Sequence, residues 1–177
     1  KIKNEFGEKI TKIVDGLTKI GKLNTKGYSD VSIQAENYRK MLLTLNEDVR
    51  VIIIKIADRL HNMQTLSSMP YEKQIQKASE TLYIYAPLAH RIGLYNIKTE
   101  LEDLGLKYTD PDTYDEISEK LIESKKDQDE YIKKFNSIIS STLTKEKLKY
   151  SLKGRTKSIF SINSKMIRQG ISFEEVY

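Results

Sequence analysis

The sequence of 177 residues contains no cysteine. This absence excludes a disulfide framework, a zinc site built from thiolates and a cysteine nucleophile, and it fits a reducing compartment, so we expect a cytoplasmic protein. No hydrophobic run reaches the roughly 20 residues that a membrane-spanning helix needs, and no glycine-rich phosphate loop of the Walker type is present. The chain also begins without methionine, and its first residues already have a helical pattern, so we expect an excised fragment with no membrane association.

The composition predicts a folded chain with anionic partners. With 38% hydrophobic and 31% charged residues, it can bury one sizeable core, or one domain and the beginning of a second. The formal net charge of +5 favours nucleotides, pyrophosphate, RNA or an acidic protein face. Because Asp and Glu are interspersed among the lysines, most of this charge is expected on solvated helix faces. A basic RNA-binding helical domain remains an alternative that only the charge supports.

Hydrophobic periodicity predicts a chain of helices with one strand near its end. Glycine and proline mark several expected boundaries: Gly21, Gly105 and Gly170 as helix ends, and Pro87 as a kink or restart. The Asn46-Glu47-Asp48 break and Asp110 are expected to cap the helices that follow them. The predicted helices cover residues 10–21, 35–45, 49–66, 71–105, 111–138 and 159–170, and alternating residues predict a strand at 147–154.

The run VIIIKIADRLHNMQTL at residues 51–66 is the most informative segment. At 100° per residue, one apolar stripe is expected to face the core: Val49, Ile52, Ile53, Ile56, Leu60 and Met63. Asp58, Asn62 and Thr65 share the opposite side, and Val51 and Ile54 begin that second line. The sequence therefore predicts a helix that starts buried all round and then presents polar groups.

These polar groups suit a metal ion and a phosphate ester. The second line offers a carboxylate, an amide and a hydroxyl in succession, from Asp58, Asn62 and Thr65. Oxygen ligands of this kind bind hard or borderline cations, and amides and hydroxyls bind phosphate oxygens. The alternative is a solvated face with three ordinary polar residues, which the pattern alone favours.

Five blocks in order carry a resemblance to a known family. They are KIVDGLTKIGKL (12–23), QAENYRKMLL (34–43), VIIIKIADRLHNMQTL (51–66), IYAPLAHRIGLYNIKTELEDLGLKY (84–108) and GRTKSIFSINSKM (154–166). The chain resembles the RelA/SpoT family, bifunctional synthetase-hydrolases of (p)ppGpp. The resemblance implies a mainly α fold: the later part of an HD-type helical hydrolase domain at 1–108, a helical connector at 109–146, and the first strand and helix of an α/β nucleotidyltransferase-like synthetase domain at 147–177.

For the hydrolase half, the resemblance implies a metal-dependent release of the 3′-pyrophosphate of (p)ppGpp. Asp58 matches a ligand of a manganese ion, and Asn62 and Thr65 match positions that line the nucleotide pocket, with a catalytic role for Asn62. The family's histidine-aspartate motif is expected to precede this chain, so the fragment alone is expected to be inactive. His61 could serve as a second ligand, although packing is the favoured role. Gln64 stands where family members often carry arginine, which suggests a weakened phosphate contact.

For the synthetase half, the resemblance implies transfer of pyrophosphate from ATP to GDP or GTP with Mg²⁺. Arg155, Lys157 and Lys165 match residues that contact ATP phosphates; without the resemblance they would be read as a solvated basic surface. Asn163 and Ser164 replace a commoner tyrosine-arginine pair, which leaves open a degenerate regulatory module that binds guanine nucleotides without catalysis. A ribosome or regulatory partner would bind through regions outside this chain.

Overall fold

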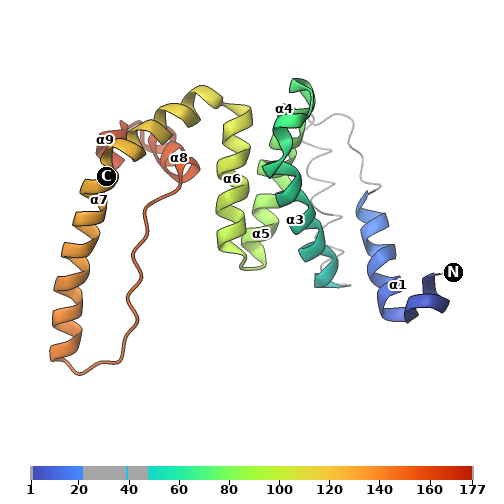
Figure 1. The fold of residues 1–177 in the computed structure, drawn as a ribbon, viewed down its shortest axis with the longest axis horizontal. Helices are drawn as coiled ribbons and strands as arrows, with labels where there is room; N and C mark the ends of the chain where they lie inside the picture. Colours follow the sequence, from blue (N-terminus) through green and yellow to red (C-terminus); the bar gives the residue numbers. More distant parts are fainter. Residues whose placement is uncertain (1, 22–38, 40–47, 177) are drawn as a thin grey trace. The chain divides into compact units, whose positions relative to one another are not determined.

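All regular secondary structure in the described residues is helical. The computed structural model describes residues 2–21, 39 and 48–176 (Figure 1). The mainly helical fold predicted from the sequence is confirmed for them, whereas the predicted helix at 35–45 and the loop before it lie outside them, apart from residue 39. None of the described helices is long and apolar enough to cross a membrane.

The chain forms two compact units, Lys1–Thr109 and Asp110–Tyr177. The first unit contains α1 (Ile2–Gly21), α3 (Val49–Gln64), the short 3₁₀ helix η1 (Leu66–Ser68), α4 (Tyr71–Glu80), the π-helix η2 (Thr81–Tyr85), α5 (Ala86–Arg91) and α6 (Tyr95–Thr109). The second unit contains α7 (Pro111–Lys145), α8 (Ile159–Gln169) and α9 (Phe173–Val176). The division into three segments that the resemblance implied stays a prediction.

The core of the first unit lies between α3, α4, α5 and α6, which Figure 1 shows side by side. Helix α3 contributes Ile52, Ile56 and Met63, which are fully buried. They pack with Leu88 of α5 and Leu101 of α6. Burying each such side chain stabilises the fold by about 1.5–3 kcal/mol, so α3 is held with one face fixed toward the core.

The apolar stripe predicted for α3 is correct in its centre and wrong at its start. Val49 and Ile53 are 45% and 43% exposed, although the periodicity placed them in the core. Val51 is buried instead, because α1 approaches it so closely that a Cβ on Gly16 would lie 2.8 Å from a Val51 methyl carbon. Since Ile54 is also 42% exposed, the prediction that the helix starts buried all round is wrong among the described residues.

Several predicted boundaries are confirmed and others are wrong: α1 begins earlier, at Ile2, α7 continues to Lys145, and a turn at residues 92–94 interrupts the helix predicted at 71–105. Asp48 caps α3 through its side chain, Asp110 caps α7 in the same way, and Gly170 ends α8 in the left-handed conformation at φ 64°. Gly105 does not end its helix, because α6 continues to Thr109. The glycine serves packing instead: a Cβ there would lie 2.5 Å from a terminal carbon of Leu82.

The predicted restart at Pro87 is confirmed, and it involves a π-helix. Helix α5 begins at Ala86 with the proline in its first turn, where a missing N–H is tolerated. The preceding turn is widened, since the Ala86 N–H donates to the Thr81 carbonyl five residues back. Thr81 is buried, and its hydroxyl donates to the Lys77 carbonyl at 2.7 Å. The widened turn changes the direction in which Tyr85 projects relative to a regular helix.

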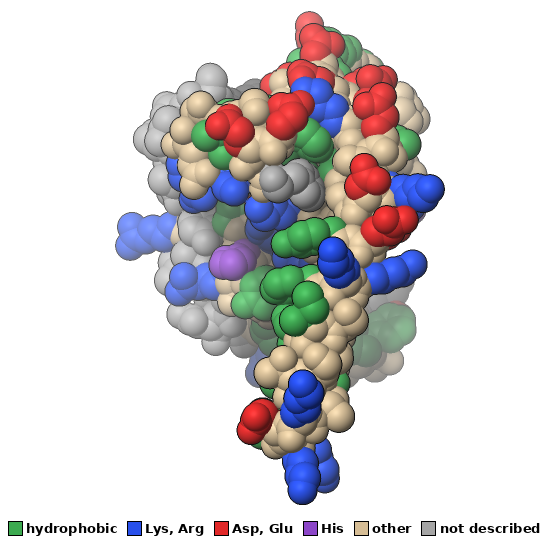
Figure 2. Space-filling model, turned by 90° about the vertical axis from the view of Figure 1, so that its left-hand side faces the viewer, with side chains coloured by type: hydrophobic (Ala, Val, Ile, Leu, Met, Phe, Trp, Pro, Cys, Tyr) green, Lys and Arg blue, Asp and Glu red, His purple; other side chains and the backbone are tan. Residues whose placement is uncertain are grey.

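The second unit has a small core of its own, in which Ile117 of α7 packs with Ile162 of α8 and with Phe173 and Val176 of α9. Figure 2 shows one face on which hydrophobic side chains reach the surface between lysine and arginine side chains.

Residues 148–158 form an irregular connection with no assigned strand. A strand is assigned only where it pairs with another, and the described residues offer no partner, so the strand predicted at 147–154 stays a prediction.

Candidate functional site

Asp58 and Asn62 form a linked pair on the outer face of α3. The Asn62 side-chain nitrogen donates to one carboxylate oxygen of Asp58 at 3.3 Å, as expected for residues one helical turn apart. The other carboxylate oxygen lies 3.3 Å from the Lys55 ammonium. The Asp58 side chain is 54% exposed, so its carboxylate is accessible to a ligand from solution.

The described residues supply one carboxylate for a metal ion rather than a complete metal site. Among residues 2–21, 39 and 48–176, no three His, Cys, Asp or Glu side chains lie close enough together to hold a metal. Asp58 fits the role of a single ligand because its oxygens are exposed and one of them contacts only a neutral amide. A divalent ion at Asp58 would need further ligands from outside these residues.

A cavity of about 150 Å³ lies beside this pair and contains two of the residues that the sequence singled out. It is lined by Arg59, Asn62, Thr65, Leu66, Ser68, Met69 and Lys77. Thr65 is the C-cap of α3, and its hydroxyl donates to the His61 carbonyl at 3.1 Å. The structure therefore brings Asn62 and Thr65 to one cavity, and Asn62 connects this cavity to Asp58.

A buried charged cluster behind the cavity was missed by the sequence analysis. Arg59 lies 2.9 Å from a carboxylate oxygen of Glu80, and its guanidinium carbon lies 4.1 Å from the centre of the Tyr85 ring. Burial acts to lower the pKa of Arg59, but Tyr85 and Glu80 outweigh it and raise this pKa. Arg59 falls seven residues after Ile52 and three after Ile56, so a basic residue on the buried stripe was the available signal.

Gln64 has a different partner from the one suggested by the sequence. Its side-chain nitrogen donates to the Glu100 carboxylate of α6 at 2.6 Å. Gln64 is also absent from the lining of the cavity. The side chain therefore joins α3 to α6, and its role as a weakened phosphate contact has no support from this arrangement.

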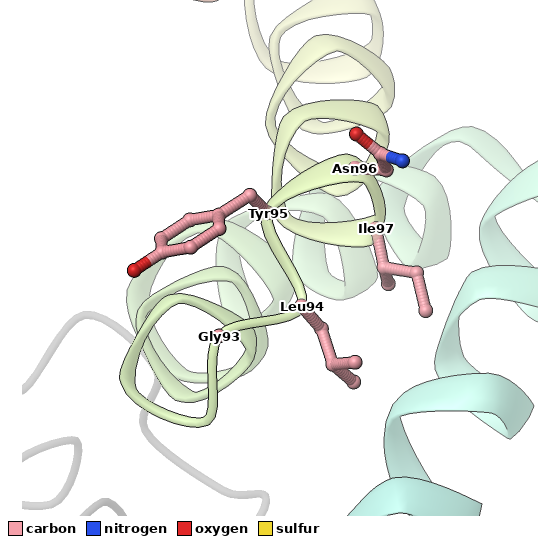
Figure 3. Close-up of a pocket in the computed structure, with 5 residues that line it drawn as sticks. All are labelled: Gly93, Leu94, Tyr95, Asn96 and Ile97. Atoms are coloured by element: carbon pink, nitrogen blue, oxygen red, sulfur yellow. The ribbon is translucent and has the colours of Figure 1, made fainter. Parts of the chain in front are cut away.

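A second hollow, of about 310 Å³, is less suited to chemistry. It is lined by the α5–α6 turn and the first residues of α6: Gly93, Leu94, Tyr95, Asn96 and Ile97. Figure 3 shows the Tyr95 side chain pointing away from Leu94 and Ile97. Among the described residues, this tyrosine is the one titratable group that lines the hollow, so they offer it neither an acid-base pair nor a metal ligand of the usual kind.

In the second unit the structure brings two of the three predicted phosphate contacts near each other. The pKa of Lys157 is lowered, first by partial desolvation and then by the positive charge of Lys165. The Lys157 ammonium also donates to the Val176 carbonyl at 3.5 Å. Arg155 is exposed on the irregular segment before α8, and no contact links it to this lysine pair. The positive charge of Lys165 thus disfavours the charged form of Lys157, an effect that an anion near both groups would offset.

Comparison with known proteins agrees with the resemblance drawn from the motifs. Residues 1–95 match the HD domain family. The chain is 44% identical to a GTP pyrophosphokinase of Myxococcus xanthus over 173 residues, which is 97% of this chain and 23% of that protein. It is 44% identical to a guanosine-3′,5′-bis(diphosphate) 3′-pyrophosphohydrolase of Aquifex aeolicus over 180 residues, which is 99% of this chain and 25% of the relative. The chain thus spans about a quarter of the length of these curated relatives.

Proposed function

Because this chain belongs to the HD domain family, we propose that its first unit takes part in the metal-dependent hydrolysis of the 3′-pyrophosphate of (p)ppGpp. The products are GDP or GTP and pyrophosphate. The parent protein is also proposed to transfer pyrophosphate from ATP to GDP or GTP, the activity that the names of several relatives describe. The observation that carries the proposal is the exposed Asp58–Asn62 pair, whose Asn62 lines the cavity that Thr65 also lines.

In this proposal Asp58 is one ligand of a manganese ion, whose remaining ligands come from outside the described residues. When bound, such an ion would lower the pKa of a coordinated water and would so supply a hydroxide nucleophile for attack on the phosphate. Asn62 holds the Asp58 carboxylate in place through its side-chain amide N–H, and its side-chain amide oxygen is proposed to accept a hydrogen bond from the nucleotide. Thr65 lines the same cavity and is proposed to contact the nucleotide.

In the second unit, Lys157, Lys165 and Arg155 are proposed to bind the phosphates of ATP, with Mg²⁺ in the synthetase reaction. The lowered pKa of Lys157 supports this role. A polyphosphate near both lysines would offset the repulsion from Lys165 that contributes to this lowering. The connector at 109–146 and the synthetase start at 147–177 are part of the same proposal, as is a cytoplasmic location.

A regulatory module that binds a guanine nucleotide without hydrolysis is the second candidate. It is favoured by one observation, the single carboxylate that the described residues offer to a metal. The two candidates differ in a simple way. Hydrolysis requires the Asp58 carboxylate for the chemical step, whereas binding alone requires only the cavity.

The test is manganese-dependent pyrophosphate release from guanosine 3′,5′-bis(diphosphate) by the full natural protein. Asp58→Ala should abolish release while the nucleotide still binds. Asn62→Ala should lower the rate by about 10- to 100-fold, the usual loss when a residue that orients a metal ligand is removed. The control is Asp129→Ala, because Asp129 is an exposed aspartate of α7 in the second unit and is not among the residues that line the cavity. Equal rates for Asp58→Ala and the natural protein would refute the hydrolase assignment.

A further inference from the structure

Two cations share one carboxylate oxygen beside the cavity. The same Glu80 oxygen lies 2.9 Å from the Arg59 guanidinium and 3.3 Å from the Lys77 ammonium. The cluster of Arg59, Lys77 and Glu80 therefore carries one positive charge in excess. The Arg59 and Glu80 side chains are 9% and 8% exposed, whereas Lys77 is 32% exposed, so the excess charge is accessible at Lys77.

Lys77 can leave Glu80 at little cost. If its ammonium turned away, Glu80 would keep the shorter contact with Arg59, and no buried charge would be left without a partner. Arg59 is held independently of that ammonium, by Tyr85 and by the Lys77 backbone carbonyl at 3.4 Å. Lysine has a flexible four-carbon stem and three donors, which suits a group that exchanges one partner for another.

The walls of the cavity suit a flat ring with a polar edge. Leu66 and Met69 supply apolar surface, while Asn62, Thr65 and Lys77 supply polar groups. A diphosphate would leave the apolar walls facing charged oxygens, whereas a purine buries apolar faces and keeps hydrogen bonds at its rim. Thr65 lies seven residues beyond Asp58, or about 10 Å along the helix, so a base at Thr65 leaves room for ribose and phosphates toward Asp58.

We propose that Lys77 determines base specificity by donating to the acceptor edge of guanine in this cavity, an inference that rests on the proposed function. An ammonium group only donates hydrogen bonds. Guanine presents two acceptors, O6 and N7, on one edge, whereas adenine places an amino donor in the position of O6. Lys77 therefore favours a guanine nucleotide over an adenine nucleotide, and this preference comes from α4 rather than from the α3 face that carries Asp58.

The test compares two nucleotides that differ only in the base. Isothermal titration calorimetry of the full natural protein measures the Kd of guanosine 3′,5′-bis(diphosphate) and of its adenosine counterpart. Lys77→Met should raise the Kd of the guanine nucleotide about 10-fold and change that of the adenine nucleotide by less than about twofold, since one such contact is worth 1 kcal/mol or more. Lys77→Arg keeps a donor-only cation and should retain most of the preference.

The matched control is Lys73→Met, which removes an exposed lysine one turn earlier on α4 that does not line the cavity. This variant should bind both nucleotides as the natural protein does. Equal weakening of both nucleotides by Lys77→Met, with a reduced salt dependence, would place Lys77 on a phosphate and overturn the base assignment. Unchanged affinities would overturn it as well. If the natural protein itself binds neither nucleotide, the proposed function fails, and the inference fails with it.

Discussion

Replacing Glu80 by glutamine should destabilise the first unit by roughly 3 kcal/mol, because it leaves the buried Arg59 charge without a carboxylate. Both residues are only 7% exposed, and their side chains are 2.9 Å apart. Removing one partner of such a pair typically costs about 3–5 kcal/mol. The lower end applies here, since Arg59 keeps its contact with the Tyr85 ring and a bond to the Lys77 carbonyl.

The same contacts predict an unequal response from the two partners. Arg59→Met should cost less, roughly 2 kcal/mol, because Glu80 would retain Lys77 at 3.3 Å as a counter-charge. The double variant Arg59→Met with Glu80→Gln removes both buried charges. It should therefore be more stable than Glu80→Gln alone, and the double-mutant cycle should give a coupling of about 0.5–3 kcal/mol.

Hydrogen exchange of the α3 and α4 amides in the full natural protein is the suitable assay, because it reports the free energy of opening of these helices and not of other domains. Lys55→Met is the control. It breaks the exposed Lys55–Asp58 pair, and exposed pairs contribute about 0–1 kcal/mol. A loss of less than about 1 kcal/mol for Glu80→Gln, within the range of a surface pair, would refute the reasoning.

Three further changes test other parts of the fold. Gly105→Ala should destabilise α6 by about 1–3 kcal/mol despite alanine's higher helix propensity, measured by exchange of the α6 amides, because the new methyl group would overlap Leu82. Burial raises the pKa of Glu102, against the opposing effect of Lys98, so ionisation of Glu102 destabilises the folded state above that pKa. Glu102→Gln should therefore gain stability relative to the natural protein at neutral pH, and the gain should disappear in melts recorded as the pH falls through the raised pKa toward the usual carboxyl value. Ser158→Ala removes the cap of α8 and should cost about 1 kcal/mol, seen as faster exchange at the amide of Ser161.

Helices and their ends were predictable because their signals are local. The caps at Asp48 and Asp110 depend on residues within three positions, and both were read correctly. Gly105 was misread for the opposite reason: glycine at a helix end and glycine at a close contact look alike in sequence, and only the position of Leu82 distinguishes them. The exposure of Val49 and Ile53 was mispredicted for a similar reason. It depends on α1 packing against Val51, and the sequence of α3 does not show where α1 lies.

The residues of the candidate site also differ in whether local sequence patterns could predict them. Asp58, Asn62 and Thr65 were found from the sequence because one helix face orders them. The hydrogen bond between Asp58 and Asn62 follows directly from their spacing of four. The cluster of Arg59, Lys77 and Glu80 was not found, because it joins α3 to residues of α4 that lie 18 and more positions later, and the periodicity of one helix does not show which helix packs against it.

A single helix can set groups in a line, but it approaches a bound nucleotide from only one side. The roles proposed for Asp58 and Asn62, one metal ligand and the residue that orients it, follow from that line. Recognition of a base needs a group from a second direction, and α4 supplies one in Lys77, which lines the cavity together with α3 residues. Substitutions on α4 should therefore change which nucleotide binds while leaving the rate at saturating nucleotide nearly constant, whereas substitutions at Asp58 should change that rate.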